Sequence, residues 1–156
     1  MAEKVGVLGP SDLPAVIDVE ATGGEPPSIV ADAVRKWLAR VGAKTGKPPI
    51  VYTARYFWDG DVEGAAFGDH PLWVADYGAS CPDLPDAWTG WLFWQYGDRS
   101  DIGGLSTNVD VDWFNGSREA LFSAAGLPSD AQSGANADDV TRVIDRSPCS
   151  NLAERS

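Results

Sequence analysis

The sequence predicts an α/β fold in which one parallel strand–helix–strand unit is followed by strands that no long helix separates. Two observations predict the unit. An apolar run at residues 13–20 is followed by an amphipathic helical pattern, and a second apolar run follows at residues 50–53. A third observation predicts the change of pattern: after Trp58, apolar strand-like pieces recur with only Gly, Pro, Asp and Ser loops between them.

The strand–helix–strand unit occupies the first third of the chain. Residues 2–8 are expected to form one or two helical turns, closed by a Gly-Pro pair. Residues 13–20 indicate a buried strand that ends in carboxylates. A helix is expected to follow, with Ser28 as its N-cap and with Gly42 or Gly46 at its end. Its apolar positions share one face: Val30, Val34, Trp37, Leu38 and Val41.

Further strands are predicted at residues 50–53, 72–77, 91–96 and 109–113. A short helix over residues 117–125 is expected next, capped by Ser117 and ended by a Gly and a Pro. From residue 129 onward the chain is rich in Ser, Asp, Ala, Gln and Asn and lacks aromatic residues. We therefore expect one domain over residues 1–127 and a flexible, disordered tail over residues 128–156.

Composition excludes several classes of protein. The chain has 156 residues, a formal charge of −11 and a pI near 4.3. That balance argues against a nucleic-acid partner, because phosphate contacts need Lys and Arg. No apolar run approaches the ~20 residues that span a bilayer, and the N-terminus lacks the apolar core of a signal peptide. Two cysteines exclude a disulfide-rich scaffold and a Cys-cluster zinc site, and Cys81 is expected to be an inert thiol.

Aromatic residues are concentrated in the middle of the chain. Fourteen of the sixteen Trp, Tyr and Phe residues lie between Tyr52 and Phe114. Such rings pack cores, and they also form platforms for sugar rings. Because side chains alternate along a strand, some of these residues must be structural while others line a cleft. The strand residues that could line it are Tyr52, Trp73, Tyr77, Trp94, Gln95 and Tyr96.

Two pairs of carboxylates occur at strand-like spacing. Asp18 and Glu20 are two residues apart, so both side chains point to one face, about 6–7 Å apart at a rise of ~3.3 Å per residue. Repulsion at that range favours one group holding a proton, as the cleavage of a glycosidic bond requires. Asp110 and Asp112 repeat the spacing. The solvated ends of strands are the structural alternative for both pairs.

Clustered carboxylates also suit a divalent metal, either as a metal centre or as the Asp-x-Asp of a metal-dependent glycosyltransferase. Both alternatives usually need basic or Gly-rich groups to hold phosphate, and none lies near these acids. His70, the only histidine, precedes a proline and is expected to be a loop or packing residue. No Gly-x-Ser-x-Gly motif is present.

The order of these motifs resembles glycoside hydrolase family 25, the Chalaropsis-type lysozymes or N-acetylmuramidases. The resemblance runs from about Leu13 to Gly116 and rests on five segments: residues 13–20, 49–53, 71–77, 93–96 and 108–114. It implies cleavage of the β-1,4 bond between N-acetylmuramic acid and N-acetylglucosamine, so the implied partner is the glycan strand of peptidoglycan. It implies no metal and no organic cofactor.

The resemblance also implies roles for individual residues. Glu20 matches the general acid, and Asp18 matches the neighbouring carboxylate that assists the transition state or orients the N-acetyl group. Asp110 matches the aspartate of the last strand. Where the family usually has Asn two residues later, this chain has Asp112, a further candidate. The residues that match the sugar groove are Tyr52, Trp73, Tyr77 and Gln95.

The implied fold is a TIM-like irregular (β/α) barrel, of which this chain would hold about strands four to eight. Such a partial barrel leaves sheet edges exposed, and these could pair with a second copy or a partner. The leading hypothesis is a peptidoglycan hydrolase, with the activity of the truncated chain in doubt. The alternative is a non-catalytic wall-binding remnant. An extracellular or cell-wall location is expected for the full-length parent.

Overall fold

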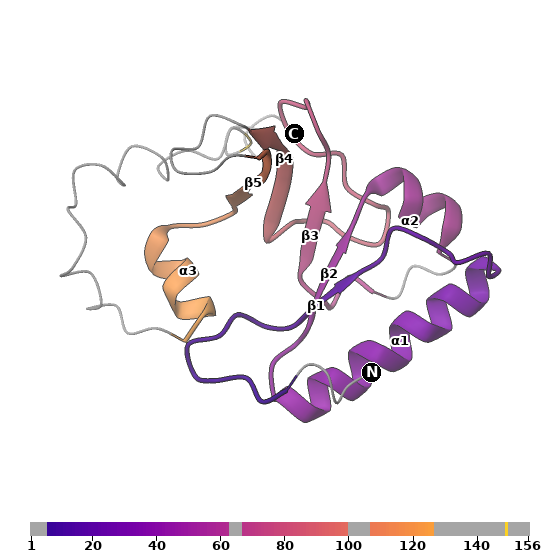
Figure 1. The fold of residues 1–156 in the computed structure, drawn as a ribbon, viewed down its shortest axis with the longest axis horizontal. Helices are drawn as coiled ribbons and strands as arrows, with labels where there is room; N and C mark the ends of the chain where they lie inside the picture. The colour runs from indigo at the N-terminus through magenta and orange to yellow at the C-terminus, as the bar shows by residue number, and fades with distance from the viewer. Residues whose placement is uncertain (1–5, 63–66, 100–106, 127–148, 150–156) are drawn as a thin grey trace.

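The computed structural model describes residues 6–62, 67–99, 107–126 and Cys149, and within them one five-stranded sheet organises the fold (Figure 1). The strands follow the order β1-β2-β3-β4-β5; β1 to β4 are parallel and β5 is antiparallel to β4. The predicted mixed α/β fold is therefore confirmed. The elements are β1 (Val16–Asp18), α1 (Pro27–Thr45), β2 (Ile50–Thr53), α2 (Arg55–Asp61), β3 (Leu72–Ala75), β4 (Phe93–Arg99), β5 (Val109–Phe114) and α3 (Arg118–Ala124).

Helix α1 connects β1 to β2, as the parallel unit requires. The helix begins at Pro27, with Pro26 in the N-cap position and no side-chain cap. The prediction of Ser28 as the N-cap is therefore wrong, because proline suits the first turn, where a backbone N–H has no partner in any case. The predicted end at Gly46 is confirmed. Its φ of 70° is the left-handed conformation that glycine adopts without strain.

The core lies between the sheet and the helices α1 and α2. The predicted apolar face of α1 is buried, with Leu38 2% and Val41 0% exposed. The residues that share this core come from the sheet, from α2 and from the connections on either side of β3: Val51, Leu72, Val74, Trp94, Trp58, Phe67 and Trp88. Trp94 is 1% exposed, so it belongs to this core and not to the cleft that its strand position suggested.

Two local predictions are wrong in the first half of the chain, and one helix was missed. The strand expected over residues 13–20 comprises only Val16–Asp18, and it is the exposed edge of the sheet, with Val16 38% exposed. Residues 6–8 form no helical turn, and residues 1–5 lie outside the described part. Helix α2 was not predicted, because seven residues are too few for the amphipathic period to be recognised.

The second half agrees more closely with prediction. No helix occurs in the connection from β3 to β4. Helix α3 begins after Ser117, whose Oγ accepts a hydrogen bond from the Ala120 N–H at 3.2 Å, so the predicted cap is confirmed. No helix within the described ranges is long and apolar enough to cross a membrane.

Cys81 is not a free thiol. It forms a disulfide with Cys149, 68 residues later, so the expectation of an inert thiol is wrong. These are the two cysteines of the sequence, so only one pairing within the chain is possible, but whether they meet depends on where the chain returns. Residues 127–148 and 150–156, which hold most of the predicted tail, lie outside the described part of the chain.

Candidate functional site

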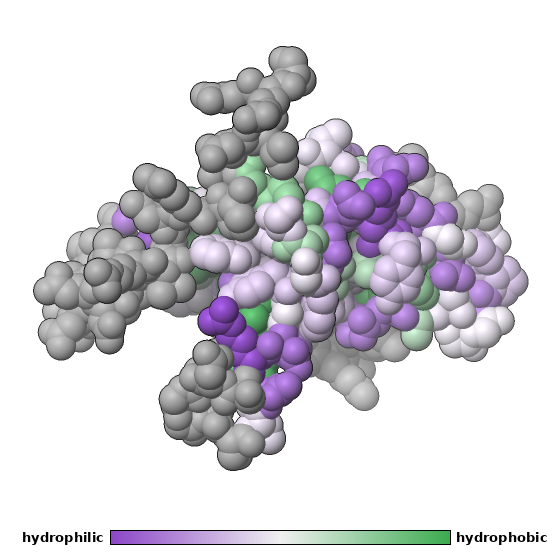
Figure 2. All heavy atoms as spheres, turned by 90° about the horizontal axis from the view of Figure 1, so that it is seen from above, coloured by the Kyte–Doolittle hydropathy of each residue, from purple (hydrophilic) through white to green (hydrophobic). Residues whose placement is uncertain are grey.

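A pocket of about 730 Å³ lies at the carboxyl ends of β1 to β3, and Gln95 of β4 also lines it. The carboxyl edge of a parallel sheet is where α/β proteins usually bind ligands. In Figure 1 the arrowhead of β3 points to the carboxyl edge of the sheet. Figure 2 shows the molecule from that side, where strongly hydrophilic residues (purple) lie beside residues of intermediate hydropathy (white). The lining residues are Glu20, Tyr52, Ala54, Arg55, Tyr56, Asp59, Ala75, Asp76, Tyr77, Asp83 and Gln95.

Glu20 is held at the pocket by the backbone of its neighbour Val19. The Val19 N–H donates to the Tyr52 carbonyl at 2.9 Å, and the buried Thr53 hydroxyl donates to the Val19 carbonyl at 2.7 Å. These bonds extend the pairing of β1 with β2 by one residue. Glu20 itself lies beyond the strand, so the prediction that both carboxylates belong to one strand is corrected: β1 ends at Asp18.

Gln95 joins two tyrosines across the pocket floor. It is 5% exposed, and its Oε1 accepts hydrogen bonds from the Tyr52 hydroxyl at 2.6 Å and from the Tyr77 hydroxyl at 3.0 Å. The Tyr77 hydroxyl also lies 3.3 Å from Oδ1 of Asp110, so its one proton has two acceptors within reach. Strand β5 is thereby linked to the pocket through Asp110.

Trp73 and Asp112 form a second link to β5. The Trp73 indole N–H donates to Oδ1 of Asp112 at 2.7 Å. The Trp73 ring packs edge-on against Tyr52, with ring centroids 5.6 Å apart. Burial raises the pKa of Asp112, with a smaller contribution from Asp110, while the Trp73 hydrogen bond opposes the rise.

The pKa of Tyr52 depends on burial and on the charges of several predicted acids. The pKa of Tyr52 is raised to about 12, first by burial and then by the charges of Glu20, Tyr77, Asp18 and Asp110. Glu20, Asp18 and Asp110 each contribute to this rise, after burial. The surrounding anions disfavour a phenolate at this position, so the Tyr52 hydroxyl keeps its proton to a higher pH than an exposed tyrosine does.

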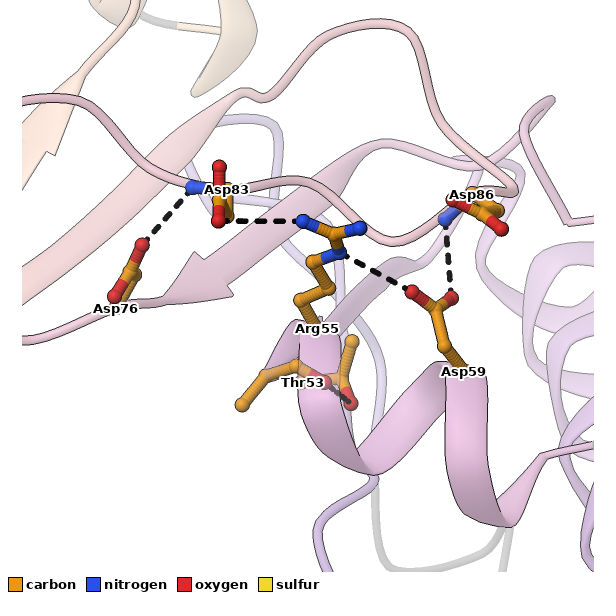
Figure 3. Close-up of polar contacts among 7 residues, drawn as sticks. Thr53, Arg55, Asp59, Asp76, Asp83 and Asp86 are labelled. Atoms are coloured by element: carbon orange, nitrogen blue, oxygen red, sulfur yellow. Dashed lines mark hydrogen bonds and ion pairs between the residues drawn. The ribbon is translucent and has the colours of Figure 1, made fainter.

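The opposite wall of the pocket was not predicted from the sequence. Arg55, at the start of α2, donates through Nε to Asp59 at 3.4 Å and through Nη1 to Asp83 at 3.2 Å (Figure 3). Oδ2 of Asp76 accepts the Asp83 backbone N–H, and Oδ1 of Asp59 accepts that of Asp86. These bonds attach the loop after β3 to α2. The only signal in the sequence was that Arg55 follows a predicted strand and that Asp76 lies near the end of another.

The predicted site residues fall into two groups. Glu20, Tyr52, Tyr77 and Gln95 line the pocket. The others lie beside it: Asp18 and Asp110 act on Tyr52 through their charges, and Trp73 packs against its ring. His70 lies in the loop before β3, away from this pocket, with Nδ1 3.2 Å from the Pro49 carbonyl oxygen. Within the described ranges, no group of three His, Cys, Asp or Glu residues is arranged to hold a metal ion.

The fold and the pocket define an α/β protein whose carboxylates and aromatic residues surround a groove at the carboxyl edge of a parallel sheet. The sequence model described as "Glycosyl hydrolases family 25" matches residues 4–105, and the chain belongs to that family.

Similar proteins agree with this membership. Protein YegX of Escherichia coli (strain K12) is 38% identical over 110 residues, which are 70% of this chain and 39% of YegX. Lysozyme M1 of Streptomyces globisporus is 34% identical over 122 residues, 72% of this chain and 41% of that protein. The crystal structure of the bacterial lysozyme from Streptomyces coelicolor superimposes with a TM-score of 0.71 at 29% identity, covering 77% of this chain and 59% of that chain. The chain thus spans about two fifths of the length of these two sequence relatives.

Proposed function

We propose that the protein is a peptidoglycan hydrolase that cleaves the β-1,4 bond between N-acetylmuramic acid and N-acetylglucosamine. The observation that supports this proposal most is that Glu20 lines one pocket with Tyr52, Tyr77 and Gln95 in a chain of glycosyl hydrolase family 25, and that Asp110 lies 3.3 Å from the Tyr77 hydroxyl. Glycoside hydrolysis needs paired carboxylates beside a sugar-binding groove, and these residues supply both.

In this proposal Glu20 is the general acid, which donates a proton to the departing glycosidic oxygen as the bond to the anomeric carbon breaks. Asp18 and Asp110 supply negative charge that stabilises the positive charge developing on the sugar. Water adds its hydroxyl to the anomeric carbon, and its remaining proton returns to the carboxylate of Glu20. Tyr52, Trp73, Tyr77 and Gln95 bind the glycan. The supporting geometry is that Gln95 and the two tyrosines are already bonded to one another, so little ordering is needed on binding.

The experiment compares the clearing of purified cell walls by the full chain and by Glu20→Gln. Removing the proton donor is expected to lower the clearing rate by about 100-fold or more. Glu25→Gln is a matched control, because Glu25 is an exposed glutamate of the loop after β1 that does not line the pocket. Clearing by Glu20→Gln at the wild-type rate would contradict the role of Glu20.

A second candidate function is binding of cell-wall glycan without cleavage. It is favoured by the aromatic lining of the pocket, where Tyr52, Tyr56 and Tyr77 offer surfaces for sugar rings. The same experiment separates the two functions. Near-zero clearing by both the wild-type chain and Glu20→Gln, together with co-sedimentation of the wild-type chain with walls, would favour the binding function.

We further propose that the five strands are the last five of a TIM-like irregular barrel, with residues 1–127 as its domain and residues 128–156 as a tail. The parallel order of β1 to β4 and the antiparallel β5 support this proposal.

Edge strand β1 could then pair with a second copy. Light scattering would test this: a concentration-dependent dimer that Val16→Lys abolishes is expected, and a monomer at all concentrations would contradict it.

We also propose an oxidising compartment, outside the cell or at its wall. The disulfide between Cys81 and Cys149 supports this, because such bonds persist chiefly where thiols are not kept reduced.

A further inference from the structure

We infer that Asp112 is a positioning residue: its carboxylate fixes the orientation of the Trp73 indole beside the pocket and thereby sets how tightly the site holds a glycan chain. The part of this inference that concerns glycan binding rests on the function proposed above. The part that concerns the indole rests on contacts within the protein alone.

Trp73 is restrained on three sides. Its N–H donates to Asp112 at 2.7 Å, its ring meets Tyr52 edge-on at 5.6 Å, and the Phe93 ring lies tilted at 5.4 Å. The two ring contacts are apolar and permit sliding and tilting, whereas the hydrogen bond to a carboxylate is short and directional. An indole has one N–H and no acceptor, so Asp112 supplies its only polar restraint among the described residues.

The hydrogen bond between Trp73 and Asp112 completes a closed series of contacts across the sheet. From Asp112 the contacts lead through the Trp73 and Tyr52 rings to Gln95, and from Gln95 through the Tyr77 hydroxyl to Asp110. Asp110 and Asp112 lie two residues apart on β5, so one strand anchors both ends. We call these six residues the contact ring: Asp112, Trp73, Tyr52, Gln95, Tyr77 and Asp110. Every predicted sugar-groove residue belongs to it.

The property that matters in Asp112 is its acceptor oxygen and not its charge. The carboxylate is partly desolvated and faces the like charge of Asp110, two effects that disfavour the ionised form, while the Trp73 hydrogen bond favours it. An amide oxygen accepts the same hydrogen bond without the repulsion. Asp112→Asn is therefore expected to preserve the orientation of Trp73, and Asp112→Ala is expected to lose it.

The first measurement needs no ligand. In the ¹⁵N-labelled full chain, the indole N–H signal of Trp73 is assigned by its disappearance in Trp73→Phe. Asp112→Ala is expected to shift this signal and to speed its exchange with solvent, whereas Asp112→Asn leaves it protected. Asp32→Ala removes a negative charge from the outer face of α1 and is expected to change nothing. An unmoved signal in Asp112→Ala would overturn the inference.

The second measurement titrates the same proteins with the tetramer of N-acetylglucosamine. We expect binding to weaken about tenfold in Asp112→Ala and to stay within about twofold in Asp112→Asn, since the loss of one oriented contact is worth roughly a factor of ten. Equal weakening in both variants would assign the effect to charge and overturn the inference. If the wild-type chain does not bind the tetramer, the link between Asp112 and glycan binding fails, whereas the clearing of cell walls still decides the proposed function and the indole signal still decides the Trp73–Asp112 contact.

Discussion

Tyr52 is the side chain on which the charges of the pocket converge. Its hydroxyl donates to Gln95 at 2.6 Å, its ring packs against Trp73, and three predicted acids contribute to the rise of its pKa to about 12. Because the phenol stays protonated well above neutral pH, it remains a hydrogen-bond donor under every condition in which a carboxylate acid catalyst works. Tyr52 thus takes part in both the packing and the electrostatics of the site.

The raised pKa of Tyr52 predicts a loss of stability at high pH. Above about pH 10 the unfolded chain releases this proton, while the folded chain retains it to about pH 12, so the free energy of unfolding falls as pH rises through this window. Below pH 10 both states hold the proton and no dependence is expected from this group. Denaturant unfolding at a series of pH values should show a shallower decline for Tyr52→Phe. Identical slopes for the two proteins would refute the prediction.

At the scale of elements, α1 is held to the sheet by its buried apolar face rather than by its polar contacts. Leu38 is 2% exposed and Val41 is 0% exposed. The ion pair of Lys36 with Asp32 lies in solvent and contributes little to the free energy of unfolding. The position of α1 matters for function, because this helix brings the chain back so that β2 lies parallel to β1 and places Tyr52 beside Glu20.

Leu38→Ala is expected to lower the free energy of unfolding by about 3 kcal/mol, since a buried Leu leaves a cavity that its neighbours only partly fill. Ile29→Ala on the same helix serves as the control. Its side chain is 52% exposed, so a change within about 1 kcal/mol is expected. Urea unfolding monitored by circular dichroism measures both variants, and similar losses in the two would argue against the burial of Leu38.

At the scale of the whole molecule, the disulfide joins two parts of the chain that the sheet does not connect. Cys81 lies in the β3–β4 connection, between the pocket residues Tyr77 and Asp83, and Cys149 is bonded to it from 68 residues away. The bond therefore restrains the segment that carries one wall of the pocket. It restrains the unfolded chain even more, because it closes a long loop.

Replacing both cysteines by Ser is expected to lower the free energy of unfolding by about 4 kcal/mol, the loop-entropy value for a separation of this length. Thermal or urea unfolding of the oxidised wild type and of the double variant measures the difference. Adding a reductant serves as the control: it should lower the stability of the wild type and leave that of the double variant unchanged. A reductant effect on both proteins would mean that the loss has another cause.

Local patterns in the sequence determined most of the secondary structure. Residues 50–53 form a strand because they are apolar and bounded by proline and by polar residues, and the caps at Gly46 and Ser117 follow from short-range chemistry. The spacing of Asp110 and Asp112 likewise determined that both side chains lie on the same face of β5. Each of these depends on residues close in the chain.

Only the tertiary structure decided which distant groups meet. The way the loops return across the sheet decides three features. Trp94 is buried while Gln95 faces the tyrosines, Arg55 forms an ion pair with Asp83, and Cys81 pairs with Cys149. Periodicity gives a strand two faces but does not say which of them meets the helices. That choice is made by the free energy of packing the whole core, which no short window of sequence contains.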